Sequence, residues 1–518
     1  MTLIRGKGGY HFVYFVVVFT LIPINYLPQL LDGVYIDYAF AIGDISTVNL
    51  WYGEAGRYNH RFVIILVDKL VRYTGLPAEL LLDNILVVVL ILFCIEVKQY
   101  ASLLFGLENR WANLAALFTA IFPVWHVLAD FDIGQYLISI YLLYIGFRLF
   151  VDDKIYKNIL GASLVFLSFN VESNISMVVG LAIISLVLEK TNNNYTFPVS
   201  KLIIIILLAS LYILVRAIYL PPHGLLESYM VINWSNLGGG SLEIVRNLFN
   251  FLTFLLLFIW LPLIYYIHLK TRNKKYLRSD GSKRLEKRHF TDAKIYFLLI
   301  VLAGFAVSPY LVIGESTSII NLTDWKSRHA FLLAPLSGIF FATMFKDIAV
   351  ANCVPNKVQT RNYLIVFICV NVLLLSYGNY RKVETSLFRK NMIEQLQLFG
   401  SIPKGNVQVI SENIPGAIRF MEVNHLFFSA YKVAGWWGDA VAERVQWSDV
   451  RNTYRQKFWN KIKNNDKYLS LFMLGEYIDE CDIYVHLKDS MGKYERIRKL
   501  YIFRSEKYYN IDNIVIEC

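Results

Sequence analysis

The stretch 33–61, GVYIDYAFAIGDISTVNLWYGEAGRYNHR, mixes acids, bases and aromatic side chains and directly follows the first apolar segment of the chain. Loops that only join two helices are usually shorter and plainer, and binding or catalytic residues concentrate in long, chemically varied loops. The foremost acid is Asp37, which is flanked by Tyr35 and Tyr38. A carboxylate in this position can act as a general base that removes a proton from a hydroxyl group. The other candidate substrate-binding or phosphate-binding residues of the loop are Tyr35, Asp44, Trp51, Arg57, His60 and Arg61.

Basic residues elsewhere in the chain indicate an anionic ligand. Arg216 lies near the end of an apolar span, where a charge is costly and is a functional candidate by default. A second group lies before another apolar span and consists of Trp325, Lys326, Arg328 and His329. The arginine fork can make paired hydrogen bonds to a phosphate group. We therefore expect a pocket for a phosphorylated lipid, with phosphate ligands among Arg57, Arg216, Lys326, Arg328 and His329.

Further acids fall in the connections that we place on the same side of the chain's membrane spans. These candidate substrate-binding acids are Asp130, Asp132, Glu172 and Glu315. The sequence has no nucleophilic Ser or Cys motif, no phosphate-binding Gly-rich loop and no zinc-ligand spacing. We expect neither a metal nor another cofactor.

Composition indicates a polytopic helical membrane protein. Of the 518 residues, 56% are hydrophobic and only 18% are charged, and the apolar residues form blocks long enough to cross a hydrocarbon core of about 30 Å. The net charge of +11 is typical of the excess of basic residues in cytoplasmic loops, so we expect membrane lipids and no nucleic acid as partners. Eleven spans are predicted at about 10–31, 80–97, 111–128, 133–150, two within 155–189, 202–220, 248–269, 295–313, 331–345 and 363–377.

The block 155–189 can be one long helix or two short ones. Basic residues before and after it both favour the cytoplasm, so we expect two crossings that meet outside at 170–174. Arg5 and Lys7 place the N-terminus in the cytoplasm, which puts the first outer loop, 32–79, on the opposite side. Within this loop, Arg61, Asp68 and Arg72 share one face of an amphipathic helix that we expect to lie in the membrane interface. The basic stretch 270–294 is expected to be a cytoplasmic loop.

Eleven crossings, an odd number, place the part of the chain after the last span on the outer side. We therefore expect a transmembrane domain, 1–378, and an outer C-terminal domain, 379–518. The second domain is expected to be a small α/β domain, with strands at 406–411, 482–488 and 513–518 and a helix at 427–445. Its two cysteines, Cys481 and Cys518, are either unpaired thiols or a disulfide, which requires an oxidising compartment.

This layout resembles the GT-C superfamily of polytopic glycosyltransferases, in which the first outer loop carries an acidic catalytic residue. More narrowly, Tyr35-Ile36-Asp37, Gly43, Trp51 and Gly56-Arg57 are similar to the first-loop pattern of bacterial serotype-converting O-antigen glucosyltransferases. Tyr38 stands where that family often has a second acid, so Asp37 alone would carry the acidic role.

The resemblance implies a sugar transfer on the outer face of a bacterial inner membrane. The donor would be a sugar, most simply glucose, on polyprenyl phosphate, and the acceptor a hydroxyl of a lipid-linked glycan such as O-antigen. Asp37 would deprotonate that hydroxyl, and the phosphate would leave toward Arg216, Arg328 or Arg57. The C-terminal domain would lie in the periplasm and cover the pocket.

Two other function classes fit the same composition. An O-antigen polymerase or ligase would handle the same lipid phosphate, although such proteins usually place their large outer domain between spans. A lipid-linked glycan transporter or flippase would have repeated halves with matching broken helices, and the sequence has no internal repeat.

Overall fold

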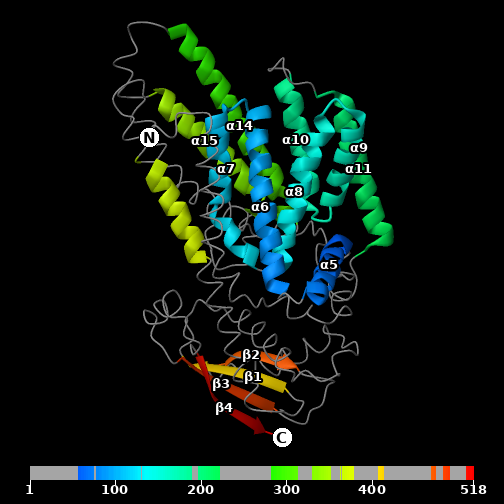
Figure 1. The fold of residues 1–518 in the computed structure, drawn as a ribbon, viewed down its shortest axis with the longest axis vertical. Helices are drawn as coiled ribbons and strands as arrows, with labels where there is room; N and C mark the ends of the chain where they lie inside the picture. The colour runs from blue at the N-terminus through cyan, green and yellow to red at the C-terminus, as the bar shows by residue number, and fades with distance from the viewer. Residues whose placement is uncertain are drawn as a thin grey trace.

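The structure is a computed structural model of the chain (Figure 1). It describes residues 57–74, 78–129, 131–189, 197–221, 282–312, 330–351, 362, 364–378, 406–412, 468–473, 482–489 and 509–517. This described part is mostly helical. Its helices are α5 (Tyr58–Thr74), α6 (Ala78–Leu103), α7 (Asn109–Ala120), the 3-10 helix η3 (Pro123–Ala129), α8 (Phe131–Val151), α9 (Ile155–Ser168), α10 (Ser173–Glu189), α11 (Val199–Tyr219), α14 (Ser282–Val312), α15 (Leu333–Ala351) and the unlabelled helix Leu364–Gly378.

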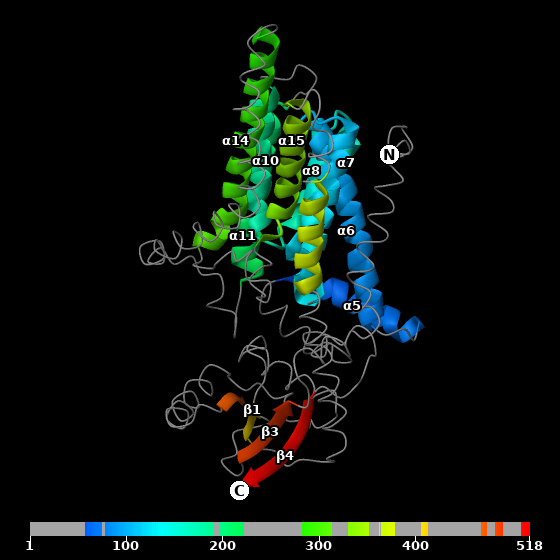
Figure 2. The same ribbon diagram turned by 90° about the vertical axis from the view of Figure 1, so that its left-hand side faces the viewer.

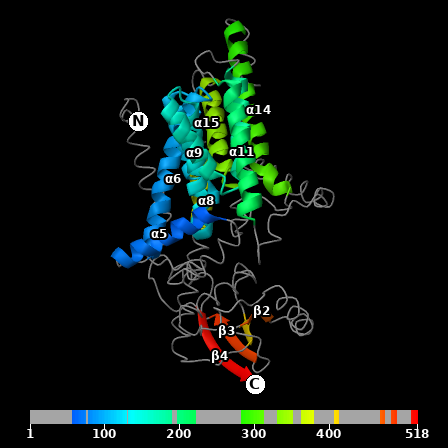
Figure 3. The ribbon, with the colours of Figure 1, turned by 90° about the vertical axis from the view of Figure 1, so that its right-hand side faces the viewer.

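The helices from α6 onward run side by side in one bundle, and α5 lies at one end of it, at an angle to α6 (Figures 2 and 3). We call this the α5 end, and we call the opposite end, where α8 turns into α9, the distal end. Successive helices alternate in direction, so the connection between α9 and α10 and the last turn of α11 both lie at the α5 end. This alternation brings residues far apart in the sequence to the same end.

Aromatic side chains fill the centre of the bundle. Phe93 of α6 meets Tyr144 of α8 edge to face, with ring centroids 5.2 Å apart, and Trp125 of η3 packs on Phe331, with centroids 5.1 Å apart. All four are almost fully buried. Edge-to-face packing of this kind adds stability beyond the burial of apolar area, so α6, η3, α8 and the start of α15 are held in fixed positions.

The predicted split of 155–189 into two helices is confirmed. α9 ends at Ser168 and α10 begins at Ser173, and the Asn174 side-chain amide donates to the Ser168 carbonyl at 2.8 Å across the turn. α8 and α9 approach closely at glycines: a Cβ atom on Gly161 would overlap the backbone of Phe150 and Gly146. These small residues allow two antiparallel helices to pack backbone to backbone.

Several predicted helix boundaries differ from the structure, and two of the differences have a local cause. The span predicted at 111–128 is helical only to Ala120, because Pro123 disfavours helical backbone at the residue before it, and η3 follows. The stretch 282–294 was predicted to be a loop, but it forms the first turns of α14, which extend beyond the bundle (Figure 1). Its sequence SKRLEKRHFTDAK contains neither Gly nor Pro and is rich in good helix formers, so nothing local stops the helix.

Pro309 in α14 shows how α10 is joined to α14. Proline has no backbone N–H, so the helix cannot satisfy the Phe305 carbonyl one turn earlier. That carbonyl accepts hydrogen bonds from the Ser176 hydroxyl at 2.5 Å and from the Ser308 hydroxyl at 3.2 Å. Gly180 of α10 lets the Phe305 ring approach, since a Cβ there would lie 2.8 Å from the ring.

Four strands follow the helices in the chain and form one sheet in the order β2-β1-β3-β4. They are β1 (Asn406–Glu412), β2 (Tyr468–Met473), β3 (Asp482–Asp489) and β4 (Tyr509–Glu517). β1 pairs in parallel with β3, and the other two pairings are antiparallel. Strands β1 and β3 match the strands predicted at 406–411 and 482–488 within one residue, β4 overlaps the strand predicted at 513–518 but begins four residues earlier, and β2 was not predicted. The predicted helix at 427–445 and both C-terminal cysteines lie outside the described residues.

Within the described residues, two helices, Asn84–Leu103 and Val199–Tyr219, are long and apolar enough to cross a membrane. Much of the outer surface of the bundle is apolar as well. Leu207 and Ile213 of α11 are 62% and 57% exposed, and Ile159 of α9 is 65% exposed. Exposed apolar area on this scale marks a surface that meets lipid or another protein.

Candidate functional site

A cluster of charged and aromatic side chains lies at the α5 end of the bundle. It consists of Arg57, Tyr136, Glu172, Tyr212 and Arg216, which come from four separate parts of the chain. Arg57 directly precedes α5, and its guanidinium lies 5.4 Å from the centre of the Tyr136 ring near the start of α8. The Arg57 residue is only 9% exposed, so its charge depends on such contacts more than a surface charge would.

Arg216 and Glu172 form the ion pair of this cluster. Glu172 ends the short turn between α9 and α10, and Arg216 lies in the last turn of α11, where a positive charge is favoured by the helix dipole. Their side chains are 14% and 27% exposed, respectively. The pair is therefore partly shielded from water, yet it remains within reach of a ligand.

Tyr212 lies one helical turn before Arg216, which places both side chains on the same face of α11. Its hydroxyl is within hydrogen-bonding reach of Arg216 and close enough to Glu172 and Arg57 to feel their charges. The rings of Phe166 and Phe169 contact the Tyr212 ring edge-on, at centroid distances of 5.8 and 5.7 Å. The hydroxyl of Tyr212 is thus fixed among the three ionised groups.

The turn that carries Glu172 is itself anchored by buried polar groups. Asn170, Ser173 and Asn174 are each at most 5% exposed, and the Tyr310 hydroxyl of α14 donates to Ser173 Oγ at 2.9 Å. Buried polar groups are costly unless hydrogen-bonded, so these contacts fix the backbone around Glu172. The Glu172 side chain remains the exposed part of the turn.

The described side chains of the cluster carry two guanidinium charges and one carboxylate charge, a formal sum of +1. Two arginines beside a hydroxyl, at the end of an apolar bundle, form a suitable site for an anion with several oxygens, such as a phosphate ester. The structure therefore brings together three predicted site residues, Arg57, Glu172 and Arg216. It adds Tyr136 and Tyr212, which the sequence analysis missed. The spacing of Tyr212 and Arg216 was the available signal for the second of these.

The remaining predicted site residues are not described in the same detail. His60 and Arg61 lie in α5 and Asp132 in α8, but their side chains are outside the described part. The others lie wholly outside the described residues: Tyr35, Asp37, Asp44, Trp51, Asp130, Glu315, Trp325, Lys326, Arg328 and His329.

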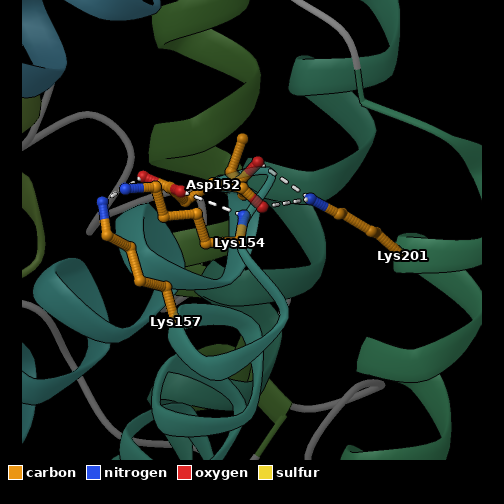
Figure 4. Close-up of polar contacts among 5 residues, drawn as sticks. Asp152, Lys154, Lys157 and Lys201 are labelled. Carbon is orange, nitrogen blue, oxygen red and sulfur yellow. Dashed lines mark hydrogen bonds and ion pairs between the residues drawn. The ribbon is translucent and has the colours of Figure 1, made fainter.

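The distal end carries a second charged cluster with a different character (Figure 4). Lys157 donates to Asp152 Oδ2 at 2.6 Å, and the Lys154 backbone N–H donates to Asp152 Oδ1 at 3.1 Å. These hydrogen bonds, the one from Lys157 first, hold the pKa of Asp152 below its ordinary value of 3.8. Lys201 of α11 donates to the carbonyls of Val151 and Asp152 at 2.8 and 3.1 Å. It thereby caps the C-terminus of α8, where a cation is favoured.

Further into the bundle, Arg148 of α8 makes a two-point contact with Glu96 of α6. Arg148 Nε lies 2.6 Å from Glu96 Oε2, and Arg148 Nη2 lies 2.9 Å from Glu96 Oε1. The Glu96 side chain is only 7% exposed. This pair and the lysines of the distal cluster are engaged with groups of the chain itself, which is the pattern of structural contacts between helices.

Among the described residues, no group of three or more His, Cys, Asp or Glu side chains is placed to hold a metal ion. Compared with known families and with curated proteins, the chain matches no family model and none of the curated proteins. The class that the described part defines is a mostly helical protein that contains helices capable of crossing a membrane.

Proposed function

We propose that this chain is a polytopic protein of a bacterial inner membrane with about eleven spans and an outer α/β domain. The apolar outer faces of α9 and α11, and the placement of Glu96, Arg148 and Arg57 toward the interior of the bundle, support the membrane environment. α5 supports an interfacial position, because Phe62 is 67% exposed while Lys69 and Arg72 are exposed on the same short helix. The N-terminus lies in the cytoplasm and the C-terminal domain in the periplasm.

We further propose that the protein is a glycosyltransferase that moves a sugar, glucose in the simplest case, from polyprenyl phosphate to a hydroxyl of a lipid-linked glycan. The observation that carries this proposal is the cluster of Arg57, Tyr212 and Arg216 at the α5 end. Arg57 belongs to the same predicted outer loop as Asp37. A phosphate held by the arginines would therefore lie at the end of the bundle where that loop runs into α6.

The chemistry follows from these residues. Asp37 takes the proton of the acceptor hydroxyl, whose oxygen attacks the anomeric carbon of the donor sugar. The bond between that carbon and the phosphate oxygen breaks, and its electron pair leaves with polyprenyl phosphate. The leaving group thereby gains a negative charge, which Arg57 and Arg216 stabilise as it develops. No proton has to reach the leaving phosphate, because a phosphate monoester is stable as an anion.

The test is a transfer assay on the purified full-length protein in lipid nanodiscs, with a panel of polyprenyl-phosphate sugars and a lipid-linked glycan acceptor. Release of polyprenyl phosphate is measured for wild type, Asp37→Asn and the control Asp153→Asn. Asp153 is an exposed acid at the distal end. We expect Asp37→Asn to lose at least about a hundredfold in rate, the usual contribution of a general base, and the control to retain wild-type activity.

The outcomes separate the competing functions. Full activity in Asp37→Asn would show that the base is another residue. No release from any donor by folded wild type, combined with chain-length growth or ligation of lipid-linked glycans, would identify a polymerase or ligase. Movement of lipid-linked glycan across the bilayer without a new glycosidic bond would identify a transporter or flippase.

A further inference from the structure

Tyr212 is a buried hydroxyl group to which the transfer mechanism above assigns no role. It is 8% exposed and is held between Phe166 and Phe169, although phenylalanine would fill the same apolar position. Its hydroxyl lies instead within hydrogen-bonding reach of Arg216, with the charges of Glu172 and Arg57 acting on it. A buried tyrosine hydroxyl is costly unless it makes hydrogen bonds, so we expect this one to have a hydrogen-bonding role.

The donor and acceptor properties of these groups define that hydrogen-bonding role. A guanidinium only donates hydrogen bonds, so in its contact with Arg216 the Tyr212 oxygen must be the acceptor. The proton of the hydroxyl is then available for donation to a second group. Glu172 lies close enough for its charge to act on the hydroxyl, and in the liganded protein an oxygen of a bound anion would accept the hydrogen bond.

We propose that Tyr212 gives this site its selectivity for a phosphoryl anion. Its oxygen positions the Arg216 guanidinium, and its proton is donated to an oxygen of the bound phosphate. The proposal rests on the proposed function only for the source of that anion, which is the phosphate of a polyprenyl monophosphate lipid. Loss of the hydroxyl should weaken phosphate binding and leave binding of the lipid chain unchanged.

The experiment compares binding of two lipids that differ only in the phosphate, a polyprenyl monophosphate and the corresponding neutral polyprenol, to the full-length protein in nanodiscs. Inorganic phosphate serves as a third probe. The variant is Tyr212→Phe, which keeps the ring between Phe166 and Phe169. The matched control is Tyr100→Phe, which removes another buried tyrosine hydroxyl, one that donates to the Tyr144 carbonyl at 2.8 Å toward the distal end of the bundle.

We expect Tyr212→Phe to bind the monophosphate roughly tenfold more weakly, as for the loss of one hydrogen bond to a charged group, and to bind polyprenol like wild type. Tyr100→Phe should leave the ratio of the two affinities unchanged. An equal loss of affinity for both lipids would show that the hydroxyl only shapes the pocket, and would overturn the proposal. Unchanged affinity for the monophosphate would overturn it too, as would tighter binding of inorganic phosphate than of the lipid.

The same preparation distinguishes this failure from failure of the proposed function. If wild type transfers sugar and Tyr212→Phe retains full selectivity for the phosphate, the role of Tyr212 is refuted and the transferase proposal stands. If wild type selects the monophosphate through Tyr212 but releases polyprenyl phosphate from no sugar donor, the transferase proposal is refuted and the anion site stands.

Discussion

Replacing Glu172 by glutamine should make the protein bind a polyprenyl phosphate more tightly. Glu172 pairs with Arg216 in the unliganded structure, so a phosphate that needs the same guanidinium must first displace the carboxylate. Glutamine keeps the size of the side chain but removes its charge. With 14% and 27% of the two side chains exposed, the pair is more shielded than a surface pair, and its coupling is estimated at about 1–2 kcal/mol. Since about 1.4 kcal/mol corresponds to a factor of ten, affinity should rise about tenfold.

Equilibrium binding of a polyprenyl monophosphate to the protein in nanodiscs measures this effect. Glu108→Gln is the matched control, because Glu108 lies 3.1 Å from Arg110 in an ion pair whose acid is 70% exposed, at the distal end. A second comparison places Glu172→Gln in an Arg216→Gln background, where the gain should vanish because there is no guanidinium to compete for. Weaker binding by Glu172→Gln alone would refute the reasoning, since it would mean that Glu172 orients Arg216 for the ligand.

Three further predictions concern stability. Gly161→Ala should lower the free energy of unfolding by about 3 kcal/mol, because the new Cβ overlaps the Phe150 backbone; Gly304→Ala, with nothing within 4 Å of its Cβ, should be neutral or slightly stabilising in the same thermal melts. Glu96→Gln should lower the free energy of unfolding by about 3 kcal/mol, because it leaves the Arg148 guanidinium without its carboxylate. Adding Arg148→Met should restore part of that loss, and a double variant whose loss equals the sum of the two single losses would contradict the prediction. The pKa of the Asp152 carboxyl is depressed, so the stability that its ionised form contributes is fully present above pH 3.8 and is lost as the pH falls below that value. The melting temperatures of wild type and Asp152→Asn should therefore differ at neutral pH and converge below pH 3.8.

Within the described residues the sequence predicts the helices well because length and apolarity are local properties, whereas the spans predicted at 10–31 and 248–269 lie outside those residues. The split of 155–189, confirmed by α9 and α10, was predicted from the basic residues that flank the block. The prediction was wrong at 282–294, since a charged stretch with good helix formers looks like a loop only if charge is used alone. It also missed β2, which pairs with a strand more than fifty residues earlier in the chain.

The individual site residues were partly predictable from the sequence, but the way they are placed next to one another in the fold was not. Arg216 was identified because a charged residue in apolar surroundings is rare, and Glu172 because it lies in a connection on the predicted outer side. That they pair depends on how α11 packs beside the turn between α9 and α10, which no local pattern specifies. Glu96 gave the same signal, an acid within an apolar run, yet no role was predicted for it or for its partner Arg148.

The two ends of the bundle show why one cluster is the better candidate for a ligand site. At the distal end, Asp152 and Lys157 are five residues apart, and with Lys201 they close the turn and cap a helix. Such contacts form because helix ends need partners, and they require no ligand. At the α5 end, Arg57 and Arg216 come from distant parts of the chain and both lie close enough to Tyr212 to act on its hydroxyl. Glu172 is the more exposed member of the ion pair with Arg216. Bringing two like charges into one cluster costs free energy, which an anionic ligand would offset on binding. Under the proposed function that ligand would be a phosphate, and its binding at the α5 end would increase the stability of the protein.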